Sequence, residues 1–168
     1  MKIEILNKAK KKKIIQNLEE FGIKKIPELL VRTGRERIRA YSGSLSTEEI
    51  YDLWRILPIE GVGLYVAKDA INKKIGKQET RISLDGLHTW KDQITQKIIT
   101  LTEEQEEEWF KGKNIELTDE QQKENFEGFV IIKSSDKKDF IGTGKIGDIG
   151  KTIYAFLPKE RRRKSQTI

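Results

Sequence analysis

The chain has 168 residues, of which 33 are Lys or Arg and 27 are Asp or Glu, giving a formal net charge of +6 at neutral pH. Hydrophobic and charged residues each make up 36%, which excludes a disordered chain and a membrane protein. The absence of cysteine excludes disulfides, thiolate metal sites and cysteine nucleophiles. The N-terminus shows no signal-peptide core, so we expect a cytoplasmic protein without a membrane partner.

The charge is segregated along the chain. Residues 1–85 carry 18 basic and 12 acidic groups, residues 86–128 carry 5 and 11, and residues 129–168 carry 10 and 4. Two segments of net charge +6 therefore flank one of −6. This pattern is expected if one surface faces a polyanion and another faces solvent or a protein.

Residues 8–21 have the periodicity of an amphipathic helix, with Asn7 as its N-cap and Gly22 as the residue that ends it. Its first turns carry Lys8, Lys10, Lys11, Lys12 and Lys13. Lysines at the positive end of the helix dipole do not favour the helix. The run is either a solvated helix end or a patch that contacts phosphates.

A tight hairpin is predicted next, with strands at residues 29–33 and 35–41 joined at Gly34. Period-two alternation predicts one face with three basic residues, Arg35, Arg37 and Arg39. We favour a solvated face paired with nearby acids over an RNA-contacting ridge.

Ser46 and Glu49 form the capping box of a further helix, which Pro58 ends. The face expected to be buried carries Ile50, Leu53, Trp54 and Leu57. A strand is predicted at residues 62–67. Residues 70–79 lose periodicity and are interpreted as a linker or long loop.

The second half is predicted to be mostly β. It begins with a strand at residues 81–84 and an Asp85-Gly86 hairpin turn, followed by a strand at 96–101. Thr102, with Gln105, caps a glutamate-rich helix. Further strands are predicted at residues 129–133, 140–146 and 152–157.

Residues 142–147 spell G-x-G-x-x-G, the dinucleotide-binding fingerprint. That motif requires a following helix whose N-terminus holds the pyrophosphate, and here a strand follows instead. We therefore expect no nucleotide cofactor. The glycines are interpreted as turns between short strands, where Lys145 and Lys151 supply positive charge.

No catalytic or metal-binding constellation is recognisable. Glu103 and Glu107 share a helix face, but a solvated face is the simpler interpretation. The single histidine, His88, has no companion at ligand spacing and is expected at the surface. Core packing is expected for Trp54 and Trp109, whereas Trp90 is the least constrained tryptophan.

Several segments together resemble the region that follows the catalytic domain in Nop/Sun/Fmu-type RNA 5-methylcytosine methyltransferases. They are residues 38–46 (IRAYSGSLS), 63–67 (GLYVA), 108–115 (EWFKGKNI), 144–145 (GK) and 156–162 (FLPKERR). The resemblance implies a small α+β domain followed by a PUA-like RNA-binding pseudobarrel, as in stand-alone archaeal versions. This chain lacks the family's S-adenosylmethionine-binding domain and catalytic cysteine, so we expect no enzymatic activity.

We therefore expect an α+β protein with a mixed N-terminal domain at residues 1–78 and a PUA-like pseudobarrel at 79–168. It would bind RNA, ribosomal or precursor RNA rather than transfer RNA, in ribosome biogenesis or RNA modification. The residues expected to contact RNA are Lys145, Lys151, Lys159, Arg161, Arg162, Arg163 and Lys164, with Arg35, Arg37 and Arg39 as secondary candidates.

Three alternatives remain open. The chain could be an accessory subunit of an RNA-modifying enzyme, in which a methyltransferase supplies the chemistry in trans. Its protein partner would be such an RNA methyltransferase or a ribosome-assembly factor. It could be an adaptor that docks proteins through its acidic helix or the face around Arg37. The basic C-terminal run could also be only a solvated end.

Overall fold

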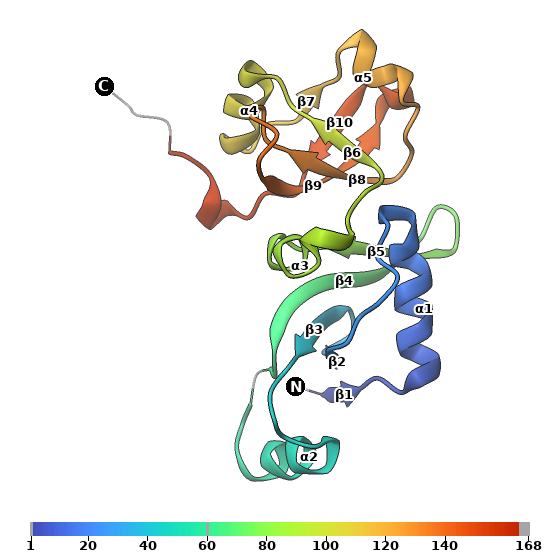
Figure 1. Ribbon diagram of the computed structural model, residues 1–168, viewed down its shortest axis with the longest axis vertical. Helices are drawn as coiled ribbons and strands as arrows, with labels where there is room; N and C mark the ends of the chain where they lie inside the picture. The colour runs from blue at the N-terminus through green and yellow to red at the C-terminus, as the bar shows by residue number, and fades with distance from the viewer. Residues whose placement is uncertain (1, 60, 165–168) are drawn as a thin grey trace. The chain divides into compact units, whose positions relative to one another are not determined.

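The computed structural model describes residues 2–59 and 61–164. The fold is mixed α+β, as expected, with 30% helix, 31% strand and a sheet that curls into a half-barrel. The chain forms two compact units, Met1–Ile94 and Thr95–Ile168 (Figure 1). The boundary expected after residue 78 falls inside a strand of the first unit, so it is corrected to the segment around residues 94 and 95.

The first unit is an antiparallel meander of five strands, in the order β1-β2-β3-β4-β5, with helices on its faces and ends. Its strands are β1 Ile3–Ile5, β2 Leu29–Thr33, β3 Arg37–Tyr41, β4 Leu64–Asn72 and β5 Lys77–Ile82. Its helices are α1 Lys8–Leu18, α2 Thr47–Ile56 and α3 Leu84–Thr89, with short 3-10 turns η1 Glu19–Phe21 and η2 Lys91–Gln93.

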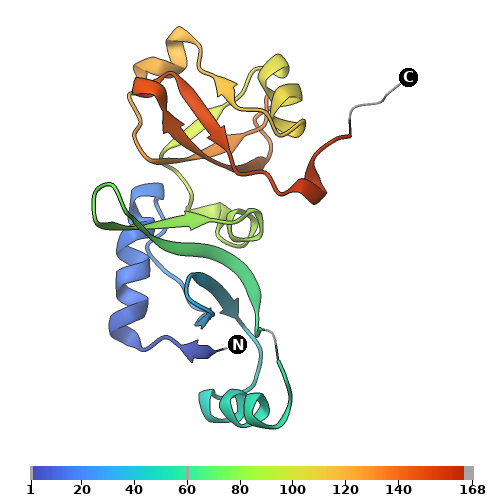
Figure 2. The same cartoon turned by 180° about the vertical axis from the view of Figure 1, so that it is seen from behind.

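Helix α1 forms as the sequence predicts. The side chain of Asn7 accepts a hydrogen bond from the Lys10 N–H, and Gly22 ends the helical segment with a φ of 98°. Ile14 and Leu18 are buried. Helix α1 contacts β5, and Figure 2 shows it beside the β4–β5 hairpin. One face of α1 therefore closes the core and the other presents its lysines.

A buried polar network joins β2, β4 and β5. The carboxylate of Asp69, whose side chain is fully buried, accepts hydrogen bonds from Arg32 at 3.1 Å and Gln78 at 2.6 Å. The Thr80 hydroxyl donates a third bond to it at 3.3 Å and itself accepts one from Asn17 of α1. An ionised carboxylate removed from water is tolerated only with such partners.

Helix α2 begins at the predicted capping box, in which Ser46 and Glu49 bond to each other's backbone. Its predicted burial is wrong for most of the face. Ile50 is buried, but Leu53 and Trp54 are only half-buried and Leu57 is 52% exposed. Both ribbon views show α2 standing off the end of the sheet, which explains why only Ile50 of the predicted face is buried (Figure 1, Figure 2). The hydroxyl of Tyr51 also ties α2 to β1, because it accepts a hydrogen bond from the Ile5 N–H at 2.9 Å.

Two predictions around the supposed linker are wrong. Residues 70–79 belong to the β4–β5 hairpin, whose turn closes with Gly76 at a φ of 64°. The predicted strand at 81–84 and hairpin turn at Asp85-Gly86 are instead the end of β5 and helix α3, which Ser83 caps. A Cβ at Gly86 would collide with the carbonyl oxygen of Val66, so this glycine permits close packing rather than a turn.

The second unit is a mixed sheet in the order β6-β8-β9-β10-β7, in which only the β6–β8 pair is parallel. Its strands are β6 Ile98–Thr100, β7 Ile115–Glu116, β8 Phe129–Lys133, β9 Phe140–Gly147 and β10 Thr152–Ala155. Its helices are α4 Glu103–Phe110 and α5 Asp119–Lys123, with 3-10 turns η3 Asp148–Gly150 and η4 Lys159–Arg161. The four strands predicted there all form.

Helices α4 and α5 both begin with capping boxes, Thr102 with Gln105 and Thr118 with Gln121. The two glutamine amides also bond to each other reciprocally, each at 2.9 Å. This pairing ties the two helix starts together. Helix α5 was not predicted, although Thr118 and Gln121 repeat the spacing of the α4 signal.

The G-x-G-x-x-G residues lie within strand β9, not in turns between strands as expected. A Cβ on Gly142 would come 2.6 Å from Trp109, and one on Gly144 would collide with Ile153. Trp109 is completely buried and its indole N–H donates to the carbonyl of Ile141 at 3.3 Å. The glycines therefore make room for the core, and α4 is held against β9 by its tryptophan.

Replacing Asp69 with alanine is expected to destabilise the first unit by about 3 kcal/mol, because it leaves the Arg32 guanidinium, only 19% exposed, without its counter-charge. The free energy of unfolding of the first unit is measured by urea unfolding, monitored through amide hydrogen exchange in peptides from β4 and β5. The control is Asp52→Ala, which breaks the exposed pair with Arg55 and should cost under about 1 kcal/mol. Equal effects of the two variants would contradict the structural role of Asp69.

Candidate nucleic-acid interface

The basic segment at residues 159–164 is attached to the second unit at the end of α4. The backbone N–H of Arg163 donates to the carbonyl oxygen of Phe110 at 2.7 Å, and its guanidinium lies 4.7 Å from the centre of the Phe110 ring. The Nε of Arg162 donates to the carbonyl of Leu157 at 3.1 Å. The segment is therefore a positioned part of the fold as far as Arg163.

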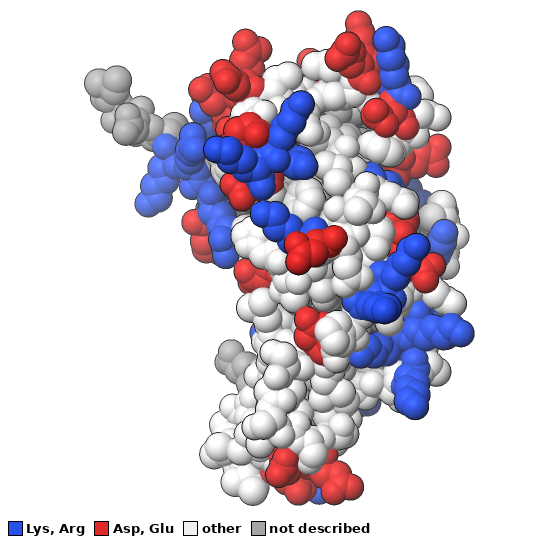
Figure 3. Space-filling model, in the orientation of Figure 1, with Lys and Arg blue, Asp and Glu red and all other residues white. Residues whose placement is uncertain are grey.

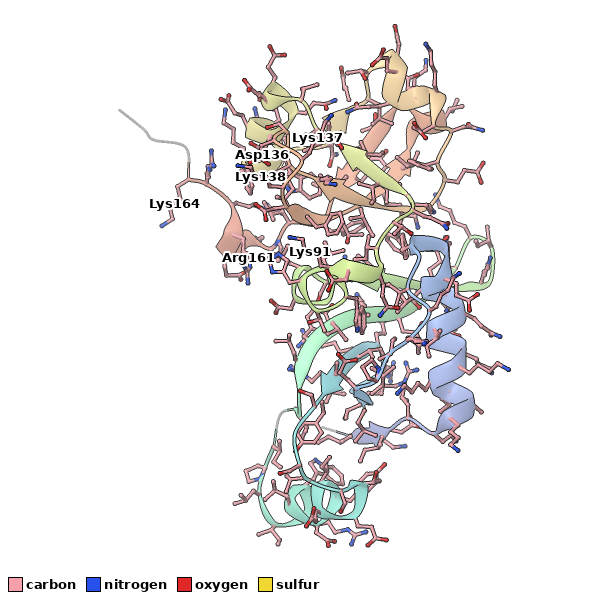
Figure 4. All side chains as sticks on the ribbon, in the orientation of Figure 1. Lys91, Asp136, Lys137, Lys138, Arg161 and Lys164 are labelled. Atoms are coloured by element: carbon pink, nitrogen blue, oxygen red, sulfur yellow. The ribbon has the colours of Figure 1, made fainter. Side chains whose placement is uncertain are left out.

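These contacts divide the predicted residues of the segment into two groups. Arg162 and Arg163 make the attachment, and the Arg162 side chain packs over Gly112. Lys159, Arg161 and Lys164 are exposed, as Arg162 and Arg163 are, so the two groups differ in these contacts and not in exposure. Figure 4 shows Arg161 and Lys164 on the segment that extends beyond the sheet. We call residues 159–164 the basic tail.

The other two lysines predicted in this unit lie elsewhere. Lys145 is in β9, not in a glycine loop, and its ammonium lies 5.1 Å from the centre of the Phe129 ring on β8. Phe129 in turn packs edge-to-face on Phe156, with 5.9 Å between ring centres. Lys151 is exposed beside η3, before β10 begins. A basic side chain beside aromatic rings is a combination that RNA-binding sheets use for phosphates and bases.

The turn between β8 and β9, which the sequence does not indicate as a candidate site, also contacts α4. Ser135, between β8 and β9, donates its backbone N–H to the carboxylate of Glu106 at 3.0 Å. Lys137 and Lys138 of this turn are exposed and are labelled in Figure 4. Hydrogen bonds from the Ser134 hydroxyl and the Lys138 N–H lower the pKa of Asp136. The acid within this turn therefore remains ionised and offsets part of its positive charge.

The three arginines predicted to share one face of the first unit do not share it. Arg35 lies in the turn before β3, so only Arg37 and Arg39 are on the strand. Arg37 lies 5.9 Å from the Tyr65 ring centre, and Arg39 donates to the carbonyl oxygen of Gly63 at 3.1 Å. Arg37 and Arg39 lie on the same face of β3, as the period-two alternation predicts. The turn between β2 and β3 spans residues 34–36, so it is two residues longer than predicted.

Arg35 instead joins a second group of cations on the α1 side of the sheet. Arg32 pairs with Ile38 in the β2–β3 register and so lies on the face opposite Arg37 and Arg39. Arg32 and Arg35 line a hollow of about 340 Å³. The hollow is completed by Lys10, Lys13, Ile14, Asp69 and Gln78. We call it the basic hollow.

Part of this hollow is predictable from the sequence. The lysine run of α1 and Arg35 are both candidate phosphate contacts in the sequence, but nothing there shows that they meet, and Arg32 is not distinguished by any motif. The spacing of Lys10 and Lys13, three residues apart, indicated one helix face, yet no sequence signal connects that face with a turn some twenty residues later.

A second hollow in the first unit does not fit a polyanion. It has a volume of about 500 Å³ and lies between residues 27–29 and 41–47. The charged side chain in its lining is Glu28, and one of that carboxylate's oxygens is buried without a hydrogen-bond partner. Negative charge in the wall opposes phosphate binding.

The remaining candidates concern metals and membranes. Within the described residues, no three His, Asp or Glu side chains are grouped to hold a metal ion. His88 is exposed on α3, as expected, and Trp90, which the sequence left least constrained, is buried. No helix among residues 2–59 and 61–164 is long and apolar enough to cross a membrane.

No protein-family model matches the chain, and no curated protein matches its sequence.

Replacing Phe110 with leucine is expected to loosen the basic tail, because it removes the ring beneath Arg163 while keeping an apolar side chain against the core. The heteronuclear ¹⁵N NOE of residues 161–164 should fall. Lys111→Ala, an exposed neighbour, is the control and should leave these values at the wild-type level. An unchanged NOE in Phe110→Leu would show that the ring does not hold the tail.

Proposed function

We propose that this protein is a non-catalytic RNA-binding protein. The observation that carries the proposal is the attachment of the basic tail to α4, which holds Lys159, Arg161 and Lys164 exposed next to a folded domain. A cation held by a domain loses less conformational freedom on binding than one on a free chain end.

The binding mechanism is neutralisation of backbone phosphates by lysine and arginine. Each phosphate contact releases condensed counterions, so affinity falls as salt rises. The exposed cations lie on the 3-10 turn η4 and the residues that follow it, and they are long, flexible side chains that suit contacts with backbone phosphates. Recognition therefore rests on RNA shape and charge rather than on a base-by-base code.

Within this proposal, the second unit acts as a PUA-like pseudobarrel of the kind that follows the catalytic domain in Nop/Sun/Fmu-type methyltransferases. The support is the sequence resemblance, together with a mixed sheet whose last strand leads directly into the basic tail. The proposed ligand is ribosomal RNA or its precursor, bound in the cytoplasm during ribosome assembly or RNA modification. A methyltransferase acting in trans would supply any chemistry.

A protein-interaction adaptor is the second candidate, favoured by the surface of α2. Ile56 is 77% exposed and Leu57 52% at the end of α2, and the same helix carries the exposed acids Glu48, Glu49 and Asp52. Figure 3 shows acidic side chains at this end of the first unit. Exposed apolar side chains of this size are typical of protein contacts. The adaptor surface would then be α2, not α4 or the face around Arg37.

Replacing Lys159, Arg161 and Lys164 together with glutamine is expected to weaken RNA binding and to lower the slope of log affinity against log salt. The slope should fall by about 0.7–0.9 for each phosphate that the variant no longer neutralises. Fluorescence anisotropy with a labelled RNA hairpin over a salt series gives both values. Arg162 is left in place because its side chain is bonded to the domain.

The control replaces three exposed lysines outside the tail, Lys24, Lys25 and Lys123, with glutamine. This control removes the same net charge as the tail variant. If both triple variants lose RNA affinity equally, RNA is attracted by the overall positive charge of the protein rather than by a site on the tail. Unchanged affinity and slope in the tail variant would contradict the proposal.

Crosslinking the protein to total cellular RNA and sequencing the bound fragments is expected to recover ribosomal or precursor RNA. Copurification of a methyltransferase in the same experiment would favour the accessory-subunit role. Recovery of protein partners without RNA would favour the adaptor.

A further inference from the structure

We propose that the basic hollow of the first unit binds a backbone phosphate of RNA, independently of the basic tail. This inference rests on the proposed function, since it assigns a second contact to the same ligand. The two sites belong to different units, and each is argued from its own geometry.

One cation of the lining, Arg32, is held in place before any ligand binds. Arg32 donates to the carboxylate of Asp69 at 3.1 Å and to the carbonyl oxygen of Arg35 at 3.2 Å. Gln78 and Thr80 orient that carboxylate in turn. A guanidinium has five N–H donors in one plane, so these two bonds leave others to face the hollow. A planar fork of this kind suits phosphate oxygens.

The charge of the hollow exceeds what its acids neutralise. Arg32 is balanced by Asp69, and Lys10 by an ion pair with Glu4. The bond from Lys10 lowers the pKa of Glu4, so this acid is ionised at neutral pH. The two further cations of the lining, Lys13 and Arg35, are both exposed. Figure 3 shows the basic side chains gathered over α1.

The lining distinguishes a backbone phosphate from a nucleotide or an apolar ligand. Its one apolar member is Ile14, which is 1% exposed, and it contains no aromatic ring. A base would find no surface on which to stack. The volume of about 340 Å³ accommodates a phosphate group with several waters, each of which occupies about 30 Å³ in the liquid.

The test replaces Lys13 and Arg35, the two exposed cations, with glutamine. Both are exposed residues of the lining, and neither side chain takes part in the hydrogen bonds around Asp69, so the fold should be retained. Lys24→Gln combined with Lys25→Gln is the matched control, since it removes the same charge from exposed positions of the same unit. Glu4→Gln is the opposite variant, because it releases Lys10 from its partner.

Binding is measured with a 3′-labelled RNA hairpin carrying either a 5′-phosphate or a 5′-hydroxyl, over a salt series. The Lys13/Arg35 variant should bind both RNAs more weakly, with a salt slope lower by about 0.7–0.9 for each phosphate that the hollow no longer neutralises. The control should match the wild type within error, and Glu4→Gln should bind more tightly.

Three other results would contradict the inference that the basic hollow binds a backbone phosphate. If the tail variant loses affinity while the Lys13/Arg35 variant does not, the hollow is no RNA site and the proposed function stands. If the loss is confined to 5′-phosphorylated RNA, the hollow takes a terminal phosphate and not the backbone. If the wild-type protein binds neither RNA, the proposed function and this inference both fail.

Discussion

An ionised carboxylate withdrawn from water needs donors in place of its hydration shell, and Asp69 obtains them from Arg32, Gln78 and Thr80. These bonds connect β2, β4 and β5, and Asn17 extends the network to α1. The bond from Arg32 that helps to satisfy the carboxylate also fixes the Arg32 side chain in the lining of the basic hollow. A structural requirement in the interior thus positions a cation at the surface.

The second unit depends in a similar way on one large side chain. Trp109 is completely buried because Gly142 leaves space for its indole, and this contact sets α4 against β9. The next residue, Phe110, then offers both its carbonyl oxygen and its ring to Arg163. The position of the basic tail follows from core packing, although the tail itself lies at the surface.

Sequence signals that depend on interactions within a few residues predict the structure correctly. The capping boxes at Ser46 and Thr102, the cap at Asn7 and the strands of the second unit form as predicted, because side chain and backbone within a few residues determine them. The exposed residues of the β4–β5 hairpin show no apolar alternation, so the sequence pattern indicates a linker where the structure has paired strands. Gly86 was taken for a turn because its packing partner, Val66, is twenty residues away.

The sequence by itself determined the α+β class, most elements, the block pattern of charge and the presence of a basic tail, since these follow from composition and short-range periodicity. Only the tertiary structure decided which cations meet. It separated Arg35 from Arg37 and Arg39, brought Arg35 beside Lys10, Lys13 and Arg32, and used Arg162 and Arg163 to attach the tail. Strand register and burial set these groupings, and both depend on contacts between distant parts of the chain.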